Sequence, residues 1–178
     1  MHRLFVALRP PPAIRQQLLD LMGGVPGARW QDDDQLHITL RYIGEVTTPV
    51  AEDVAAALGG VHAAPLALRL NGAGSFDKHD WPNAIWAGIA PHDAITALHK
   101  KIDHALIRVG LPSEARAYLP HITLARLSRS AGPVNGFLAN HAALTSAPFE
   151  IGHMLLFESH LGGEGPSYDA IGRWALSG

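Results

Sequence analysis

His37-Ile38-Thr39-Leu40 and His121-Ile122-Thr123-Leu124 are identical tetrapeptides, separated by about half the length of the chain. Successive side chains of a β-strand point to opposite faces, so residues two apart share a face. If each tetrapeptide is a strand, its histidine and threonine lie on one face, and its isoleucine and leucine lie on the other, toward a core. Two such strands would present two imidazoles and two hydroxyls to one cleft.

The elements around the two tetrapeptides are expected in the same order. Short apolar runs indicate strands, and apolar residues three or four apart indicate helices. The expected strands are 4–8, 36–43 and 66–70, then 84–89, 119–127 and 149–157, and the expected helices are 11–22 and 50–58, then 93–109 and 133–141. Self-similarity at a fixed offset indicates a duplicated unit.

We therefore expect an α+β fold built from a duplicated βαβ-containing unit, with repeats over about 3–76 and 84–160. The two copies would form two pseudo-symmetric lobes, in which antiparallel-rich sheets with outer helices flank a central cleft. Residues 1–178 would then make up one bilobal domain.

Composition restricts the class of protein. Hydrophobic residues make up 47% of the chain and charged residues 17%, so a sizeable core is available. The formal net charge of −2 argues against a protein that coats long nucleic acid by charge alone. Disulfides, thiolate zinc sites and cysteine nucleophiles are excluded because there is no cysteine. Without a signal-like or membrane-spanning stretch, we expect a cytoplasmic protein with no membrane partner, and a monomer because one chain supplies both lobes.

Paired imidazoles and hydroxyls suit phosphoryl transfer by general acid–base catalysis. Opening a cyclic phosphodiester requires that an attacking water loses a proton while the leaving ribose oxygen gains one, and imidazole titrates near neutral pH. The hydroxyls of Thr39 and Thr123 can donate to the non-bridging oxygens. Arg126 could add positive charge, but an ideal strand places it on the core face, so a bulge or a strand end must intervene. The symmetry of the motifs does not say which histidine is the acid.

These paired motifs resemble the signature of the two-histidine phosphoesterase superfamily, and within it the RNA 2′,3′-cyclic phosphodiesterases, once described as 2′–5′ RNA ligases. The resemblance extends from residues 3–8 through 36–45 and 120–126 to 159–161, 165–168 and Trp174. It implies hydrolysis of RNA 2′,3′-cyclic phosphate ends to 2′-phosphomonoesters, with no metal or other cofactor. It also implies that His37 is the proton donor to the leaving O3′ and that His121 is the proton acceptor that activates water.

Four other functions remain open at this point. They are a module that binds RNA or a nucleotide 2′-phosphate without turnover, 2′–5′ RNA end-joining as the reverse reaction, a metallohydrolase, and a phosphodiesterase that prefers small nucleotides. The intact histidines and threonines count against a pure binding module. End-joining lacks an NTP-binding motif to drive it, and the chain has no His-x-His or His-Glu-x-x-His pattern typical of metallohydrolases.

Several aromatic and basic residues have two interpretations. Arg41 is either a surface residue or an extra RNA contact, and His160 is either a surface residue or part of the cleft. A terminal base could stack on an aromatic ring, although such rings more often pack in the core. The candidates for stacking are Tyr42, Phe76, Trp81, Tyr118 and Tyr168, and the expected core tryptophans are Trp30, Trp86 and Trp174.

Overall fold

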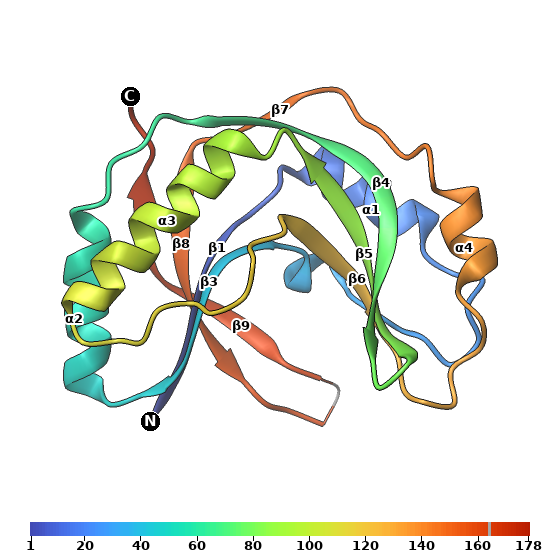
Figure 1. Ribbon diagram of the computed structural model, residues 1–178, viewed down its shortest axis with the longest axis horizontal. Coiled ribbons are helices and arrows are strands. Elements are labelled where there is room, and N and C mark those ends of the chain that lie inside the picture. The colour runs from blue at the N-terminus through green and yellow to red at the C-terminus, as the bar shows by residue number, and fades with distance from the viewer. Residues whose placement is uncertain (164) are drawn as a thin grey trace.

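A computed structural model describes residues 1–163 and 165–178 (Figure 1). The expected strands and helices are present in the expected order, with further short elements between them. In chain order the elements are β1 (His2–Leu8), α1 (Pro12–Leu21), β2 (Arg29–Trp30), the 3-10 helix η1 (Asp33–Gln35), β3 (Ile38–Val46), α2 (Thr48–Gly59), β4 (Leu66–Lys78), β5 (Trp81–Ala90), α3 (Asp93–Arg108), β6 (His121–Arg126), α4 (Asn135–Asn140), β7 (Phe149–Ile151), β8 (His153–His160) and β9 (Ser167–Ala175).

Nine strands within the described residues form one sheet. Their order is β7-β4-β5-β6-β3-β1-β8-β9, and β2 also pairs with β6. The pairings between these strands are antiparallel. β3 and β6, which carry the two tetrapeptides, meet in the middle of this order. The prediction of an α+β fold with antiparallel strands is confirmed.

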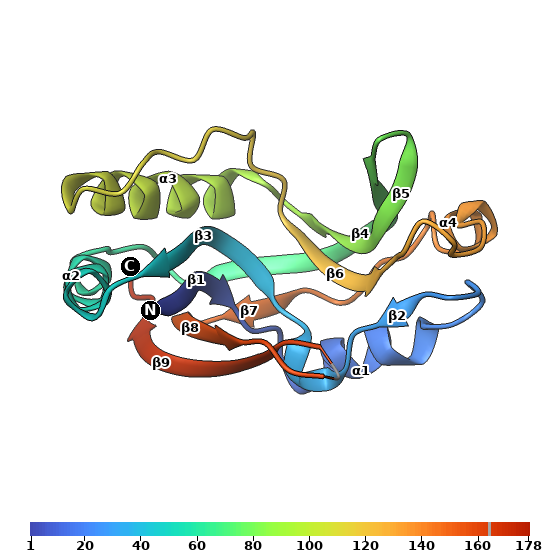
Figure 2. The same cartoon turned by 90° about the horizontal axis from the view of Figure 1, so that it is seen from below.

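Each half of the sheet has its own helices. In Figure 1, α2 and α3 lie over the half that contains β3, β1, β8 and β9, whereas α1 and α4 lie beside the half that contains β6, β5 and β4. Figure 2 shows α3 running along one side of β3 and β1. The space between sheet and helices is the core, and α3 fills it with residues at the expected helical spacing, namely Ile95, Leu98, Ile102 and Leu106.

The last strand of each repeat pairs with the first strand of the other repeat. β4, from the first repeat, pairs with β5, and β8, from the second, pairs with β1. Each half therefore contains strands from both repeats, and neither repeat makes a separate lobe. We therefore propose that residues 1–178 form one bilobal domain, with repeats at about 3–76 and 84–160. The exchange of strands between the repeats supports this proposal.

Several strands and one tryptophan differ from expectation. β2 and β9 were not predicted, and the strand expected at 149–157 is divided at Gly152 into β7 and β8. Trp30 and Trp174 are half-buried against the margin of the core. Trp86, also half-buried, lies instead beside Phe76, with the ring centroids 5.5 Å apart, so its assignment to the core was wrong. Among the described residues, no helix is both long and apolar enough to cross a membrane.

Candidate active site

The register between β3 and β6 brings the two tetrapeptides side by side. Ile38 pairs with Ile122, and both side chains are fully buried in the core. Because the pairing is antiparallel, His37 comes next to Thr123, and Thr39 next to His121. Residues one step from a buried pair point to the opposite face of the sheet. All four polar side chains are half-buried there, as the alternation of the sequence predicts.

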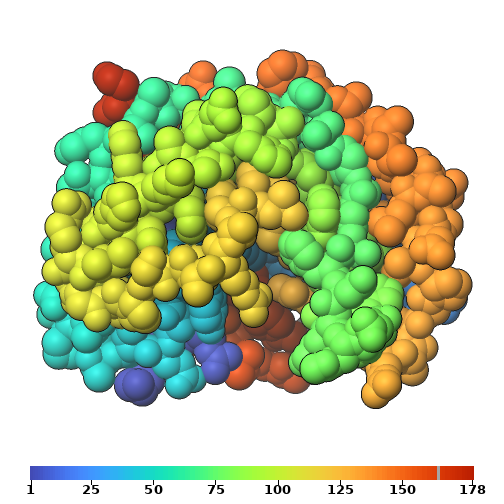
Figure 3. All heavy atoms as spheres, viewed as in Figure 1, coloured from blue at the N-terminus to red at the C-terminus, as the bar shows by residue number. Residues whose placement is uncertain are grey.

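The polar face of β3 and β6 opens into a hollow of the surface. Figure 3 shows this hollow between the segment that leads into β6 and the β4–β5 hairpin, with β8 and β9 below. The halves of the sheet on either side supply aromatic rings to it. Phe5 and Tyr168 contact the imidazole of His37, with centroids 4.9 and 5.3 Å away. Phe76 contacts the imidazole of His121 edge to face, with centroids 4.9 Å apart.

Both histidines are held in the same way by the backbone. Nδ1 of His37 lies 2.8 Å from the carbonyl oxygen of Gln35, and Nδ1 of His121 lies 2.7 Å from that of Leu119. In each case the carbonyl belongs to the residue two positions earlier. Since a carbonyl only accepts, Nδ1 carries the hydrogen and donates it, which leaves Nε2 as the group that can exchange a proton. The hydroxyl of Thr39 donates to Nε2 of His37 over 3.0 Å.

His37 is neutral in the unliganded protein. Burial lowers the pKa of His37 from 6.5 to about 4, against the opposing effect of the Gln35 carbonyl. The positive charges of Arg126 and Arg9, and that of His121 when it is protonated, lower this pKa further. Desolvation disfavours the charged imidazolium, and nearby cations add to the effect. An anion bound among these groups would have the opposite effect and raise the pKa.

His121 follows the same physical rule. Burial lowers its pKa, the carbonyl of Leu119 raises it, and the charge of Arg126 lowers it. Two neutral imidazoles next to cationic arginine make a site that gains a proton when an anion enters. This is the behaviour that a general acid and a general base for a phosphodiester require.

A β-bulge turns Arg126 toward this face of the sheet. Thr123 and Ala125 of β6 pair with two consecutive residues of β5, Trp86 and Ile85. Leu124 between them is therefore an extra residue in β6. Leu124 and Ala125 are both buried, and Arg126 is exposed. The bulge that the sequence required for Arg126 to reach the site is therefore present, and the charge of Arg126 lowers the pKa of both histidines.

Arg41 follows a matching bulge in β3, where Leu40 is the extra residue opposite β1. Its guanidinium is buried, and Nε donates to Asp103 of α3 over 2.9 Å. Further bonds run from Arg41 to the carbonyl oxygens of Tyr42 and Pro112. Arg41 is thus neither a surface residue nor an RNA contact. It holds β3 to α3 and to the segment that leads into β6.

Tyr118 also has a structural position. Its hydroxyl donates to the carbonyl oxygen of Thr39 over 2.8 Å, and its ring stacks on His99 with centroids 4.2 Å apart. Tyr118 therefore links the segment before His121 to the strand that carries His37, and its ring is not available to a base. His160, the other open case, is exposed and lies 3.0 Å from Asp169.

Sequence reasoning missed Arg9 as a neighbour of the site. The register of β1 with β3 pairs Leu8 with Ile38, so the next residue, Arg9, comes beside His37. The signal was present, since Arg9 continues the outward-facing series of Phe5 and Ala7. Its guanidinium donates to the carbonyl oxygens of Asp33 and Leu36 over 2.7 and 2.5 Å.

The comparisons with known proteins agree with this geometry. The family model described as the 2′-5′ RNA ligase superfamily matches residues 10–163. An RNA 2′,3′-cyclic phosphodiesterase of Aeropyrum pernix is 28% identical over 83% of this chain and 85% of its own length. The enzyme of the same name from Methanocaldococcus jannaschii is 26% identical over 97% of this chain and 99% of its own.

Solved structures show the same fold. A protein of Thermus thermophilus matches with a TM-score of 0.80, 23% identity, and coverage of 99% of this chain and 98% of its own. Escherichia coli LigT complexed with 3′-AMP matches with a TM-score of 0.78, 23% identity, and 99% coverage of both chains.

Proposed function

Because this chain belongs to the 2′-5′ RNA ligase superfamily, we propose that it hydrolyses the 2′,3′-cyclic phosphate ends of RNA to 2′-phosphomonoesters. The relatives from Aeropyrum pernix and Methanocaldococcus jannaschii, named RNA 2′,3′-cyclic phosphodiesterases, support this substrate class. The observation that carries the proposal is the symmetric pair of imidazoles. Each is fixed through Nδ1 by a backbone carbonyl, and each leaves Nε2 on the same face of two adjacent strands.

In the proposed reaction, His121 is the base and His37 is the acid. Nε2 of His121 takes a proton from water as the water oxygen bonds to phosphorus. The bond from phosphorus to O3′ breaks, and protonated His37 gives its proton to O3′, which leaves the phosphate on O2′. His37 takes up this proton from solvent when the substrate binds, because the anionic phosphate raises the pKa that burial and neighbouring cations lower. The resemblance to the two-histidine phosphoesterases supports this division of roles.

Thr39, Thr123 and Arg126 bind the phosphate in this proposal. Their side chains lie on the face that carries the histidines. Hydroxyl and guanidinium donors stabilise the charge that develops on the non-bridging oxygens. No metal or other cofactor takes part in the proposed steps. One chain supplies both histidines, which supports action as a monomer.

The test is hydrolysis of a short RNA that ends in a 2′,3′-cyclic phosphate, in the presence of EDTA. We expect turnover in EDTA and a 2′-phosphomonoester as the product. A product with a 3′-phosphate would contradict the proposed leaving group, and turnover that requires an added divalent cation would contradict the acid–base mechanism. Binding of the RNA without turnover by folded protein would favour a binding module instead.

A further inference from the structure

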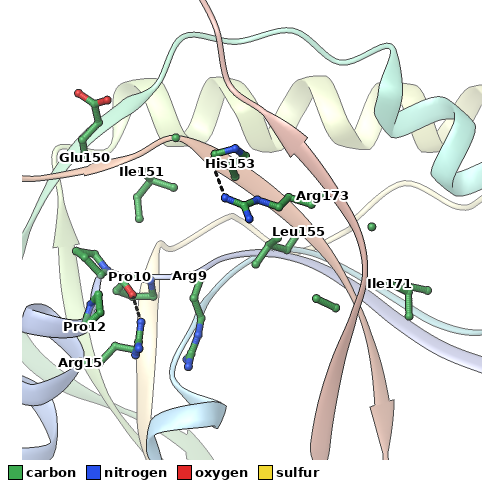
Figure 4. A pocket seen from close by; sticks show the side chains of 14 residues that line it. Arg9, Pro10, Pro12, Arg15, Glu150, Ile151, His153, Leu155, Ile171 and Arg173 are labelled. Atoms are coloured by element: carbon green, nitrogen blue, oxygen red, sulfur yellow. Dashed lines mark hydrogen bonds between the residues drawn. The ribbon is translucent and has the colours of Figure 1, made fainter.

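A cavity separate from the hollow at the two histidines lies on the same side of the sheet, and Figure 4 shows its lining residues. Its volume is about 730 Å³, within the range of pockets that hold small ligands. The end of β1, the start of α1, the junction of β7 with β8, and β9 surround it. None of the five candidate residues of the active site is among the described residues that line it.

The cavity shares one face of the sheet with the active site. Thr39 pairs with Ala7, Ala7 with Leu155, and Leu155 with Arg173, so these residues form one row across four strands. Direct partners in neighbouring antiparallel strands point to the same face. Three strand spacings, about 14 Å in all, therefore separate Thr39 of the active site from Arg173 of the cavity. A short stretch of RNA can span this distance.

Arginines from both sides reach the cavity. Arg9 and Arg15 come from the end of β1 and from α1, and they share the carboxylate of Asp33, with ion-pair distances of 3.7 and 2.8 Å. Burial and the like charge of Arg15 lower the pKa of Arg9, whereas the neighbouring carboxylates of Asp33 and Asp34 raise it. Arg173 comes from β9 on the opposite side and lies 3.3 Å from Nδ1 of His153.

The charges that line the cavity leave a positive excess. Among the described lining residues, Glu150 is the one carboxylate, and Figure 4 shows it directed away from the arginines. Outside this lining, Asp33 contacts both Arg9 and Arg15, and the exposed carboxylate of Asp34 lies 3.9 Å from the guanidinium of Arg9. Arginine offers five donors in a planar fork, which matches the oxygens of a phosphate group. A chain with a net charge of −2 therefore gathers three arginines around one cavity.

The floor of the cavity is apolar. Leu155 lies between the arginines in Figure 4, with Ile171 on one side and Pro10 and Pro12 on the other. Leu155 also packs against the cluster of Phe5, Ala7 and Phe157, whose Phe5 contacts His37. An apolar surface edged by guanidiniums suits a ligand with a flat ring and a phosphate, in other words a nucleotide.

We propose that this cavity binds a nucleotide, with its phosphate on Arg9, Arg15 and Arg173 and its ring or sugar on Leu155 and Ile171. The phosphate belongs either to the RNA chain that leads to the reacting end or to a free nucleotide. The first source rests on the proposed function, whereas the binding of a phosphate-bearing nucleotide does not.

Calorimetry with adenosine 5′-monophosphate tests the binding. We expect the wild-type protein to bind one adenosine 5′-monophosphate in the cavity. Arg173→Gln should lose this binding or weaken it at least about ten-fold, because a hydrogen bond to a charged group is lost. Arg15→Gln tests the opposite side of the cavity and should give the same result. Arg108→Gln removes the same charge from an exposed position on α3 and should bind like the wild type.

Kinetics distinguish the two sources. If the RNA chain occupies the cavity, Arg173→Gln raises the KM of a cyclic-phosphate-ended RNA about ten-fold and leaves kcat and the hydrolysis of 2′,3′-cyclic AMP unchanged. If a free nucleotide occupies the cavity, Arg173→Gln loses the binding site seen by calorimetry, and the KM values for the RNA and for 2′,3′-cyclic AMP stay the same. Unaltered nucleotide binding and KM in both Arg173→Gln and Arg15→Gln would overturn the proposal. Absence of hydrolysis by the wild type would contradict the proposed function, and calorimetry would still report on the cavity.

Discussion

Replacement of His37 by asparagine should change how the stability of the protein depends on pH. The pKa of His37 is about 4 in the folded protein, against 6.5 for an ordinary histidine. When the pH falls below 6.5, the unfolded chain binds a proton that the folded protein does not bind. The stability present above pH 6.5 is therefore lost progressively as the pH falls toward 4. Asparagine has no such titration, and its amide can still donate toward the carbonyl of Gln35.

The size of this effect follows from the two pKa values. Their separation corresponds to about 3 kcal/mol when the whole interval is crossed. Between about pH 7 and about pH 4.5, the linkage relation gives about 2 kcal/mol. His37 is half-buried, and water screens part of the interaction, so we expect ~1–2 kcal/mol.

Urea unfolding of both proteins at the two pH values measures this difference. The wild type should lose ~1–2 kcal/mol more than His37→Asn on acidification, with equal m-values. Other titrating groups contribute to both proteins and cancel in the comparison. Equal losses in the two proteins would refute the argument that burial and neighbouring cations keep His37 neutral.

Two further predictions concern neighbours of the histidines. A methyl group at Gly74 would overlap the ring of Trp86, which lies beside His121, so Gly74→Ala should lower kcat/KM about ten-fold. Gly172→Ala creates a similar overlap with a tryptophan on β9, and it should cost about 1–3 kcal/mol of stability, measured by urea unfolding, without lowering kcat/KM for 2′,3′-cyclic AMP, the substrate used for both glycine variants. Equal kcat/KM losses in the two variants would contradict a positioning role for Trp86. Arg126→Gln should lower kcat/KM at least about ten-fold and move the pH profile of kcat/KM to higher pH, since removal of this cation raises the pKa of both histidines. An unchanged profile would show that Arg126 lies outside the electrostatic reach of the pair.

Much of the fold could be predicted because its signals are local. The repeated tetrapeptide gives the strand alternation directly, and the need for a bulge before Arg126 follows from counting residues along an ideal strand. The helix 93–108 follows from its buried residues at helical spacing. These features depend on one segment of chain at a time.

The remainder depends on partners that are distant in the sequence. β9 is an edge strand with most of its side chains exposed, so it carries no apolar alternation. The buried position of Arg41 depends on Asp103, and nothing in residues 37–46 reveals that contact. The exchange of β4 and β8 between the halves is a matter of topology, and the duplication alone does not fix it.

The central claim is that His37 and His121 act together as acid and base. The most direct measurement is the turnover of a cyclic-phosphate-ended RNA by His37→Asn, His121→Asn and the double variant. Each single variant should lose at least about a hundred-fold in kcat, and the double variant should lose little more than the worse single variant, because the two groups act as a unit. Near-wild-type turnover by both single variants would contradict the account.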